Sequence, residues 1–396
     1  MLKDLFMHKL SQISVYLAIL IALFSARPWF IWGNSYVEII VLFFFIISRV
    51  SLMKNKISRR DSSITIFCII LSIYIYIVNA SDISTAFSLT CTKIIPLCLF
   101  IQLKNKEKEL FIDGFTTLFS VILLISLFSF TLFQLGFSLP YAKISHSDAH
   151  YSEFYNYYTF IIDGHLGIFT RFRSVFTEPG HVGMFAAIVI YVNNYRMSVW
   201  KFVVLMVTII WSFSLAAYIL TALGFVLYMQ FNCRTKYYLF LIPFVLFIAY
   251  VSVSVYYKEN RNSLISELII SRLEITKDGN ISGNNRHTQE FTTYYNQFKE
   301  TPKYITGLSA YEFGELPFLS GNASYKNYIL QHGLIGIVLL ALFGISCCNS
   351  YRSLQYLGLF VLYFAAFLQR PYALWEVESF LYVAYSCNAI RVRCAA

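Results

Sequence analysis

The sequence has little charge. Asp, Glu, Lys and Arg together make up 13% of its 396 residues, whereas 58% are hydrophobic. Soluble domains carry about 25% charged and about 45–50% apolar residues. A soluble globular enzyme is therefore excluded, and this much apolar sequence predicts a single transmembrane domain over residues 1–396, with the lipid bilayer as its solvent.

Several motifs with a defined chemistry are absent from the sequence. It contains no P-loop and no glycine-rich dinucleotide pattern, which leaves coupling to nucleotide hydrolysis unsupported. It has no Cys-x-x-Cys pair and no internal repeat of the kind that builds many transporters. None of the eight cysteines falls in 138–179 or 257–327, so no disulfide is expected in these two long polar segments.

Apolar runs predict an all-α, polytopic protein with about 12 transmembrane helices. The run from 202 to 231 is either one long helix or two short helices with a tight turn near Ser212–Ser214. Lys and Arg flank both ends of this run, so the positive-inside rule favours two crossings. The predicted spans are 12–26, 35–48, 63–79, 86–103, 115–137, 180–193, 199–212, 214–231, 237–256, 328–347, 354–368 and 378–390.

The positions of the Lys and Arg residues predict the orientation of the protein. Seventeen of the 31 fall in segments that this topology places in the cytoplasm, and only Arg27 and Arg370 lie in short external loops. Both termini are therefore predicted to be cytoplasmic, and 138–179 and 257–327 become two long external loops. The net charge of +10 is then an orientation signal rather than evidence of nucleic acid binding.

Both external loops are rich in aromatic residues. In the first loop these side chains suit either stacking on sugar rings or an interfacial belt, and the belt is the plainer interpretation. In the second loop, apolar residues at helical spacing predict an amphipathic helix over 262–275. A further helix is predicted to begin near Asn285, with Arg286 in its first turn, and to end before Pro302.

Six of the seven histidines lie in the external loops or at the external ends of spans. Histidine is well suited to proton transfer near neutral pH. His146, Asp148 and His150 have a spacing that would converge on zinc if this stretch were helical. Because the spacing is common and a fourth ligand is not evident, we predict neither a metal nor a cofactor.

One segment carries a resemblance to a known family. The sequence RFRSVFTEPGHVG at 171–183 places two arginines and a Phe-x-Glu-Pro core at the external start of a span. This pattern resembles that of Wzy-type polysaccharide polymerases of the O-antigen polymerase/ligase superfamily. The Arg-to-Gly spacings described for some members are not present in clean form. Three further stretches are similar to the family's: SFSLAAYILTALG at 212–224, NNRHTQEFTTYYNQFKETPKYITG at 284–307 and SYKNYILQHGLIG at 324–336.

The resemblance implies a GT-C-like membrane glycosyltransferase in the bacterial cytoplasmic (inner) membrane. Such a polymerase joins oligosaccharide repeat units carried on undecaprenyl pyrophosphate, at the outer membrane face, during O-antigen, capsule or exopolysaccharide synthesis. The implied partners are the lipid-linked donor and acceptor and the bilayer, with a chain-length regulator and a flippase as further candidates and no nucleic acid. Two alternatives stay open: a ligase that transfers the finished glycan to a different acceptor, and a lipid-linked oligosaccharide flippase, which the long external loops disfavour.

The proposed reaction releases a pyrophosphate, which needs positive charge nearby. Arginine offers a permanently charged fork for phosphate oxygens. The plainer alternative for these arginines is anchoring in lipid headgroups, or a pair with Glu290 in the case of Arg286. The substrate-binding candidates are Arg171, Arg173, Arg286, His332 and Arg370.

The attacking sugar hydroxyl needs a proton acceptor or an orienting carboxylate. The catalytic candidates with suitable chemistry are Glu178, His181 and His287. Glu178 has two plainer alternatives, a helix-terminal role favoured by the macrodipole and a salt bridge with Arg173. The plainer alternative for the histidines is a solvated position at a helix end.

Two charged residues, Lys93 and Glu38, fall within predicted spans. Charges inside a membrane are costly and often functional. For Lys93 we favour a structural pairing with a carboxylate, with contact to a substrate phosphate as the alternative.

Overall fold

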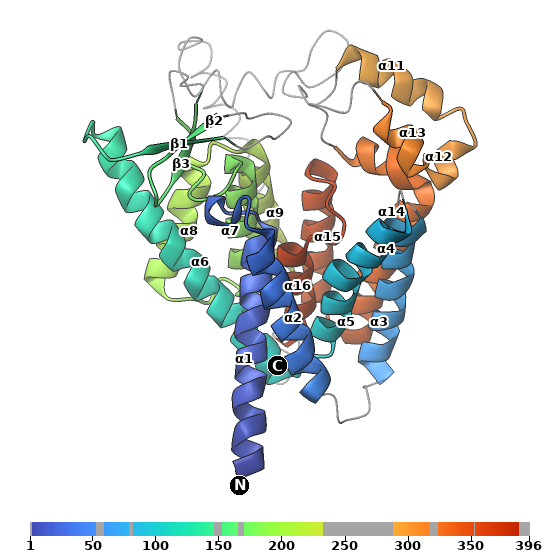
Figure 1. Ribbon diagram of the computed structural model, residues 1–396, viewed down its shortest axis with the longest axis horizontal. Coiled ribbons are helices and arrows are strands. Elements are labelled where there is room, and N and C mark those ends of the chain that lie inside the picture. The colour runs from blue at the N-terminus through green and yellow to red at the C-terminus, as the bar shows by residue number, and fades with distance from the viewer. Residues whose placement is uncertain are drawn as a thin grey trace.

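The computed structural model of the chain describes residues 2–52, 59–78, 82–145, 153–164, 170–232, 288–316, 324–351 and 353–387. Most of them are helical. Figure 1 shows the long helices bundled together, with the β-strands and α11 to α13 at one end and the start of α1 at the other. The helices are α1 (Leu2–Ser25), α2 (Ser35–Leu52), α3 (Arg59–Ser72), α4 (Ile83–Leu89), α5 (Ile95–Ile101), α6 (Asn105–Gln134), α7 (Pro179–Val192), α8 (Val199–Trp211), α9 (Leu215–Asn232), α11 (Gln289–Phe298), α12 (Lys303–Thr306), α13 (Ala310–Gly314), α14 (Tyr325–Tyr351), α15 (Leu354–Gln369) and α16 (Glu376–Ala384), with a 3-10 turn η1 (Trp29–Ile31) and two π-helical segments, η2 (Ile73–Val78) and η3 (Thr90–Ile94).

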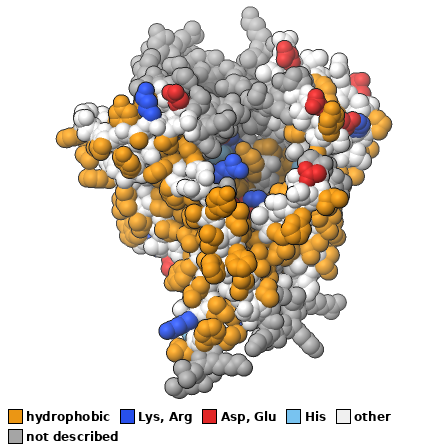
Figure 2. Space-filling model, viewed as in Figure 1, with side chains coloured by type: hydrophobic (Ala, Val, Ile, Leu, Met, Phe, Trp, Pro, Cys, Tyr) orange, Lys and Arg blue, Asp and Glu red, His pale blue; other side chains and the backbone are white. Residues whose placement is uncertain are grey.

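Many of the described helices are apolar. Four are long enough to cross a membrane, and these are Leu5–Ser25, Ile83–Ile101, Asn105–Gln134 and Tyr325–Ser350, with shorter apolar helices beside them. Hydrophobic side chains cover the body of the molecule in Figure 2. Large apolar side chains such as Phe43 and Phe128 are exposed, as expected where lipid is the solvent. The described part of the chain is therefore mostly helical, with four helices long and apolar enough to cross a membrane, which is consistent with the predicted all-α membrane protein.

The apolar run from 202 to 231 is divided between two helices, as predicted. α8 ends at Trp211 and α9 begins at Leu215. Between them Phe213 adopts a φ of 45°, which no α-helix can accommodate. The predicted span 237–256 and the predicted amphipathic helix 262–275 lie outside the described residues.

The two π-helical segments fall within predicted spans that we expected to be regular helices. η3 (Thr90–Ile94) joins α4 to α5 directly. Pro96 in the first turn of α5 lacks an N–H group, so it cannot bond to the carbonyl four residues earlier. A wider turn just before such a proline is a common accommodation, and π-turns often occur near functional sites.

α7 is the central helix of the described bundle. All of its residues are buried, and it contacts α8, α9, α15 and α16. Because it is apolar on every side, it has no face suited to solvent. A column of stacked rings on α6, formed by Phe111, Phe115 and Phe119, leads to Phe176, whose ring centroid lies 6.1 Å from that of Phe119. The core therefore fixes Phe176, which lies two residues before Glu178.

The segment predicted to be the first external loop, 138–179, contains a small antiparallel sheet that its sequence did not predict. Its strands are β1 (Ala142–Ser145), β2 (Glu153–Asn156) and β3 (Ile161–Asp163), in the order β1-β2-β3. Lys143 pairs with Tyr155, and Phe154 with Asp163. Phe154 is buried, and the ring of Tyr157 stacks on that of Phe160 at 4.7 Å. Many of the loop's aromatic residues thus pack against one another.

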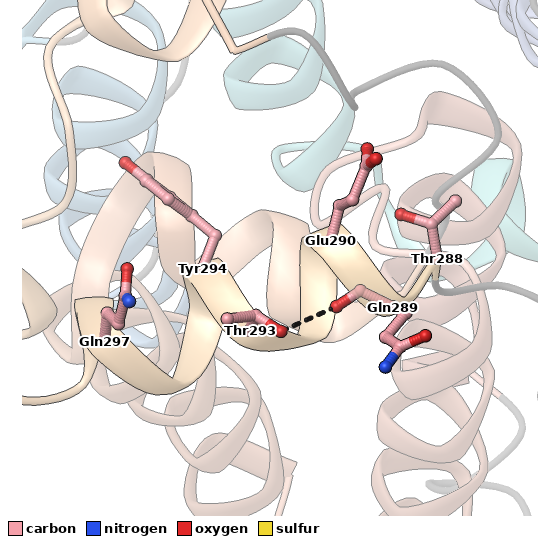
Figure 3. A pocket seen from close by; sticks show the side chains of 6 residues that line it. All are labelled: Thr288, Gln289, Glu290, Thr293, Tyr294 and Gln297. Atoms are coloured by element: carbon pink, nitrogen blue, oxygen red, sulfur yellow. Dashed lines mark hydrogen bonds between the residues drawn. The ribbon is translucent and has the colours of Figure 1, made fainter.

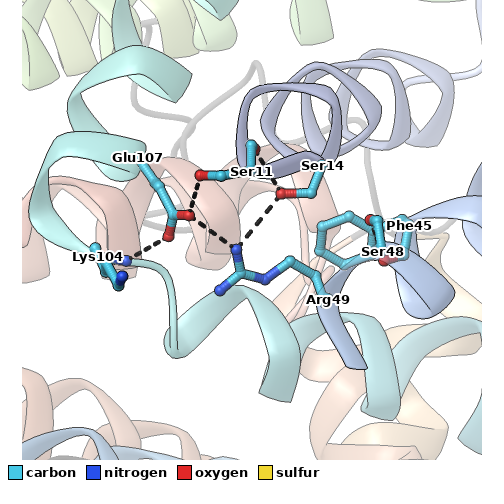
Figure 4. Close-up of polar contacts among 7 residues, drawn as sticks. All are labelled: Ser11, Ser14, Phe45, Ser48, Arg49, Lys104 and Glu107. Atoms are coloured by element: carbon cyan, nitrogen blue, oxygen red, sulfur yellow. Dashed lines mark hydrogen bonds and ion pairs between the residues drawn. The ribbon is translucent and has the colours of Figure 1, made fainter. Parts of the chain in front are cut away.

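A buried polar cluster joins three helices at the end of the bundle away from the sheet (Figure 4). The guanidinium of Arg49 on α2 lies 3.1 Å from a carboxylate oxygen of Glu107 on α6. That carboxylate also accepts hydrogen bonds from Ser11 on α1, at 2.5 Å, and from the backbone N–H of Lys104, at 2.7 Å. Arg49 also donates to Ser14 at 3.4 Å. The cluster therefore compensates both buried charges and fixes α1, α2 and α6 to one another.

The segment that contains α11 to α13 packs against a kink in α14. Gly333 leaves the helical conformation there, with a φ of 60°. A Cβ atom on Gly333 would lie 2.2 Å from the carbonyl oxygen of Ile305, so only glycine permits this approach. The Tyr74 hydroxyl donates to the carbonyl oxygens of Thr306 and His332, at 2.8 and 3.1 Å. These contacts connect η2, α12 and α14.

Candidate active site

The start of α7 positions the candidate catalytic carboxylate. Pro179 is its first residue, and Glu178 is the N-cap residue with an extended backbone (φ −123°, ψ 133°). Proline suits this place because its φ is already helical and its missing N–H is not required. The Glu178 side chain does not cap the helix. Its carboxylate instead contacts side chains from outside the segment.

Glu178 forms an ion pair with Arg370, which follows the last residue of α15. Arg370 Nη2 donates to Glu178 Oε2, and His181 Nε2 lies 4.0 Å from the same oxygen. The exposed fractions of the three side chains are only 13%, 12% and 8%. The structure thus brings together three predicted site residues, Glu178, His181 and Arg370, across 192 positions of sequence.

Aromatic rings surround His181. The imidazole lies edge-on to Trp375 at 4.9 Å and to Tyr372 at 6.0 Å, and it stacks with Phe185 at 6.3 Å. Trp375 Nε1 donates to the carbonyl oxygen of Ser25 at 2.8 Å, which fixes the indole against α1. Trp375 and Tyr372 were not predicted to be site residues, although their sequence proximity to Arg370 was the available signal.

Arg171 holds the turn between α8 and α9. Its Nε donates to the carbonyl oxygen of Ser212 and its Nη2 to that of Phe213, both at 2.9 Å. These carbonyls belong to the turn where the left-handed backbone occurs. These two hydrogen bonds therefore favour a structural role for Arg171 at the edge of the site.

Arg173 is buried in the loop that precedes α7. Its Nη1 donates to the carbonyl oxygen of Thr177 at 2.9 Å, and its Nη2 lies 3.9 Å from the Asp163 carboxylate. Its guanidinium lies 5.6 Å from the ring centroid of Phe154. Arg173 therefore connects the sheet to the residue before Glu178. The salt bridge considered between Glu178 and Arg173 is not the one formed, because Glu178 pairs with Arg370 instead.

Glycines allow the neighbouring elements to approach α7. A Cβ on Gly180 would lie 3.0 Å from Arg370 Nη2 and 3.7 Å from the Ser214 hydroxyl. A Cβ on Gly183 would lie 2.6 Å from the Cβ of Ala217 and 2.8 Å from the Ser212 hydroxyl. The small residues thus bring the α8–α9 turn and Arg370 to the first turns of α7.

Replacing Gly183 with alanine is expected to destabilise the protein by about 1–3 kcal/mol, because the added methyl group overpacks the contact between α7 and α9. The melting temperature of the detergent-solubilised protein measures this effect. Gly314→Ala is the matched control, since a Cβ there has nothing within 4 Å. Equal melting temperatures for the two variants would contradict the close packing.

His332 lies in different surroundings. It is buried on α14, its ring lies 4.6 Å from that of Tyr328, and it precedes the kink at Gly333. Its position favours a role in holding the kink.

Two predicted residues, Arg286 and His287, lie outside the described residues, as do His146, Asp148 and His150 of the zinc alternative. The helix predicted to begin near Asn285 begins at Gln289, because Thr288 is its N-cap and accepts a hydrogen bond from the backbone N–H of Phe291. The prediction that Arg286 lies in the first turn of this helix is therefore wrong.

Lys93 pairs with a carboxylate, as we favoured. Its Nζ lies 2.5 Å from Glu376 Oε1, and Glu376 is buried. Glu376 follows Trp375 directly, so this pair adjoins the aromatic wall of His181. A further buried carboxyl group, Glu378, lies two residues further along α16 and was not predicted to be a site residue.

The assembled groups define a small charged site at the end of a buried helix. It offers one carboxylate, one guanidinium and one imidazole, with the positive end of the α7 dipole beside them. No protein-family model matches the chain, and no curated protein or solved structure matches it either. The geometry of this site is therefore the basis for a functional argument.

Proposed function

We propose that the chain is a membrane glycosyltransferase that polymerises oligosaccharide repeat units carried on undecaprenyl pyrophosphate. The observation that carries the proposal is the pairing of Glu178 with Arg370 beside His181. These residues place a potential proton acceptor beside a fixed positive charge, and all three side chains are largely buried. Such an arrangement suits a reaction that deprotonates a hydroxyl group and releases a phosphate anion.

These residues supply the cation and the proton acceptor that the proposed reaction needs. A hydroxyl oxygen of the acceptor sugar attacks the anomeric carbon of the donor, and the bond from that carbon to the pyrophosphate oxygen breaks. The leaving undecaprenyl pyrophosphate takes the bonding electron pair, and Arg370 stabilises the negative charge that develops on it. Glu178 accepts the proton of the attacking hydroxyl, and His181 hydrogen-bonds the carboxylate or relays the proton. No cofactor is required by this scheme.

The proposed topology has about 12 spans in the bacterial inner membrane, with both termini in the cytoplasm. It places the Glu178 site, the sheet and α11 to α13 on the external side, where lipid-linked repeat units would be joined. Figure 2 shows a few Lys and Arg side chains among the hydrophobic ones near the middle of one face. In this topology Arg370 would meet a pyrophosphate carried at the outer membrane surface.

Deletion of the gene, followed by gel analysis of surface polysaccharide, tests the proposal. We expect a single repeat unit on the final acceptor, with the polymer ladder restored by the intact gene. Lipid-linked polymer that is not attached to the acceptor would instead indicate a ligase. Repeat units accumulating on the cytoplasmic leaflet would indicate a flippase.

A further inference from the structure

A pocket of about 660 Å³ lies along α11, and its described lining residues are different from those of the Glu178 site. Figure 3 shows the lining side chains projecting from successive turns of this one helix. The lining residues are Thr288, Gln289, Glu290, Thr293, Tyr294 and Gln297.

The helix is held in place by its other face. Phe291, Tyr295 and Phe298 are buried and pack with Leu308 and Leu330 in a separate apolar cluster. At 3.6 residues per turn, this anchoring leaves positions 289, 290, 293 and 297 exposed together. The polar face is therefore presented by a fixed helix, and a ligand would meet a preformed surface.

The chemistry of this face suits a polyhydroxyl ligand. The side chains of Gln289 and Gln297 each offer amide donors and an acceptor, and threonine hydroxyls can do both. Tyr294 adds an aromatic ring and a hydroxyl group. Burial, and secondarily the carboxylate of Glu312, raises the pKa of that hydroxyl, so it remains a hydrogen-bond donor at neutral pH.

The same face is poorly suited to a phosphate. Among the lining residues that the structure describes, none is Lys or Arg, and Glu290 carries the charge. A carboxylate repels a diphosphate but accepts hydrogen bonds from sugar hydroxyls. The charge pattern therefore separates this surface from the Glu178 site, where Arg370 supplies the positive charge.

We propose that the polar face of α11 is a saccharide-binding site that holds the glycan through its hydroxyl groups. The proposal of saccharide binding is argued from the pocket alone, whereas a role of this site in chain growth rests on the proposed function. In that role, the site retains the growing glycan between successive additions and so sets chain length.

Binding is tested on purified full-length protein in detergent micelles. The probe is an oligosaccharide of two or three repeat units, released by mild acid from the host's own surface polysaccharide. Gln289→Ala combined with Gln297→Ala is expected to weaken its binding about tenfold or more, because several hydrogen bonds are lost. Asn296→Ala is the matched control, an exposed α11 position outside the pocket. Equal affinity of the double variant and the parent, or equal loss in the control, would overturn the proposal.

Chain length in cells separates this inference from the proposed function. The double variant is expected to make shorter polymer while still lengthening chains, whereas Glu178→Gln should make none. Normal chain length in the double variant, with Glu178→Gln inactive, would remove the retention role and leave the polymerase proposal standing. If Glu178→Gln still makes polymer and the double variant still loses saccharide binding, the proposed catalytic role of Glu178 is wrong and the saccharide site on α11 stands.

Discussion

Glu178→Gln is expected to reduce polymer formation at least about 100-fold, the range seen when a catalytic base or a preorganised charge is removed. Glutamine keeps the size of the side chain but cannot accept the proton of the attacking hydroxyl. It also leaves Arg370 without its ion-pair partner. Conversion of purified lipid-linked repeat units to polymer measures the effect directly.

Two comparisons make this result specific. Glu153→Gln, an exposed carboxylate on β2, should leave polymerisation unchanged. Arg370→Gln should match the loss caused by Glu178→Gln, since each variant breaks the same pair. Membrane levels and melting temperatures need to be measured for every variant, because a broken buried pair also costs stability. Normal polymer from Glu178→Gln at normal protein level would remove this residue from the mechanism.

Arg49→Met is expected to destabilise the fold by about 3–5 kcal/mol, since it leaves the Glu107 carboxylate buried without its cation. Methionine fills much of the same volume, so the cost is mainly electrostatic. Thermal unfolding of the detergent-solubilised protein measures it. Arg173 connects the Glu178 site to the sheet, at the end of the bundle away from this cluster, so activity per folded molecule should stay normal.

The double variant Arg49→Met with Glu107→Met should recover most of this loss, because no unpaired charge remains. Lys303→Met is the surface comparison: Lys303 and its partner Glu312 have 50% and 41% of their side chains exposed, and such exposed pairs contribute little to stability. Equal losses of stability in Arg49→Met and Lys303→Met would show that the buried cluster contributes no more than a surface pair.

Much of the helical layout could be predicted from composition and charge. The division of 202–231 into α8 and α9 followed from the basic residues at both ends, because two cytoplasmic flanks require two crossings. The π-turn before Pro96 and the sheet at 142–163 could not be predicted in the same way. Both depend on local backbone bonding that leaves hydrophobic periodicity almost unchanged.

The site was predictable in its chemistry but not in its pairings. Glu178, His181 and Arg370 were chosen for their acid, base and cation chemistry and for the resemblance around 171–183. Which arginine faces Glu178 depends on tertiary packing across 192 positions, and the nearer Arg173 instead binds the carbonyl of Thr177. Sequence separation therefore gave no indication of the actual partner.

The pair between Glu178 and Arg370 has a consequence for biosynthesis. A ribosome that has just added Glu178 must add 192 more residues before Arg370 has been made, which takes roughly 10–40 s at typical rates of synthesis. During that time α7 has been made, but Arg370 is not yet present to pair with Glu178. The pair can therefore form only after α15 has been synthesised and has reached the start of α7.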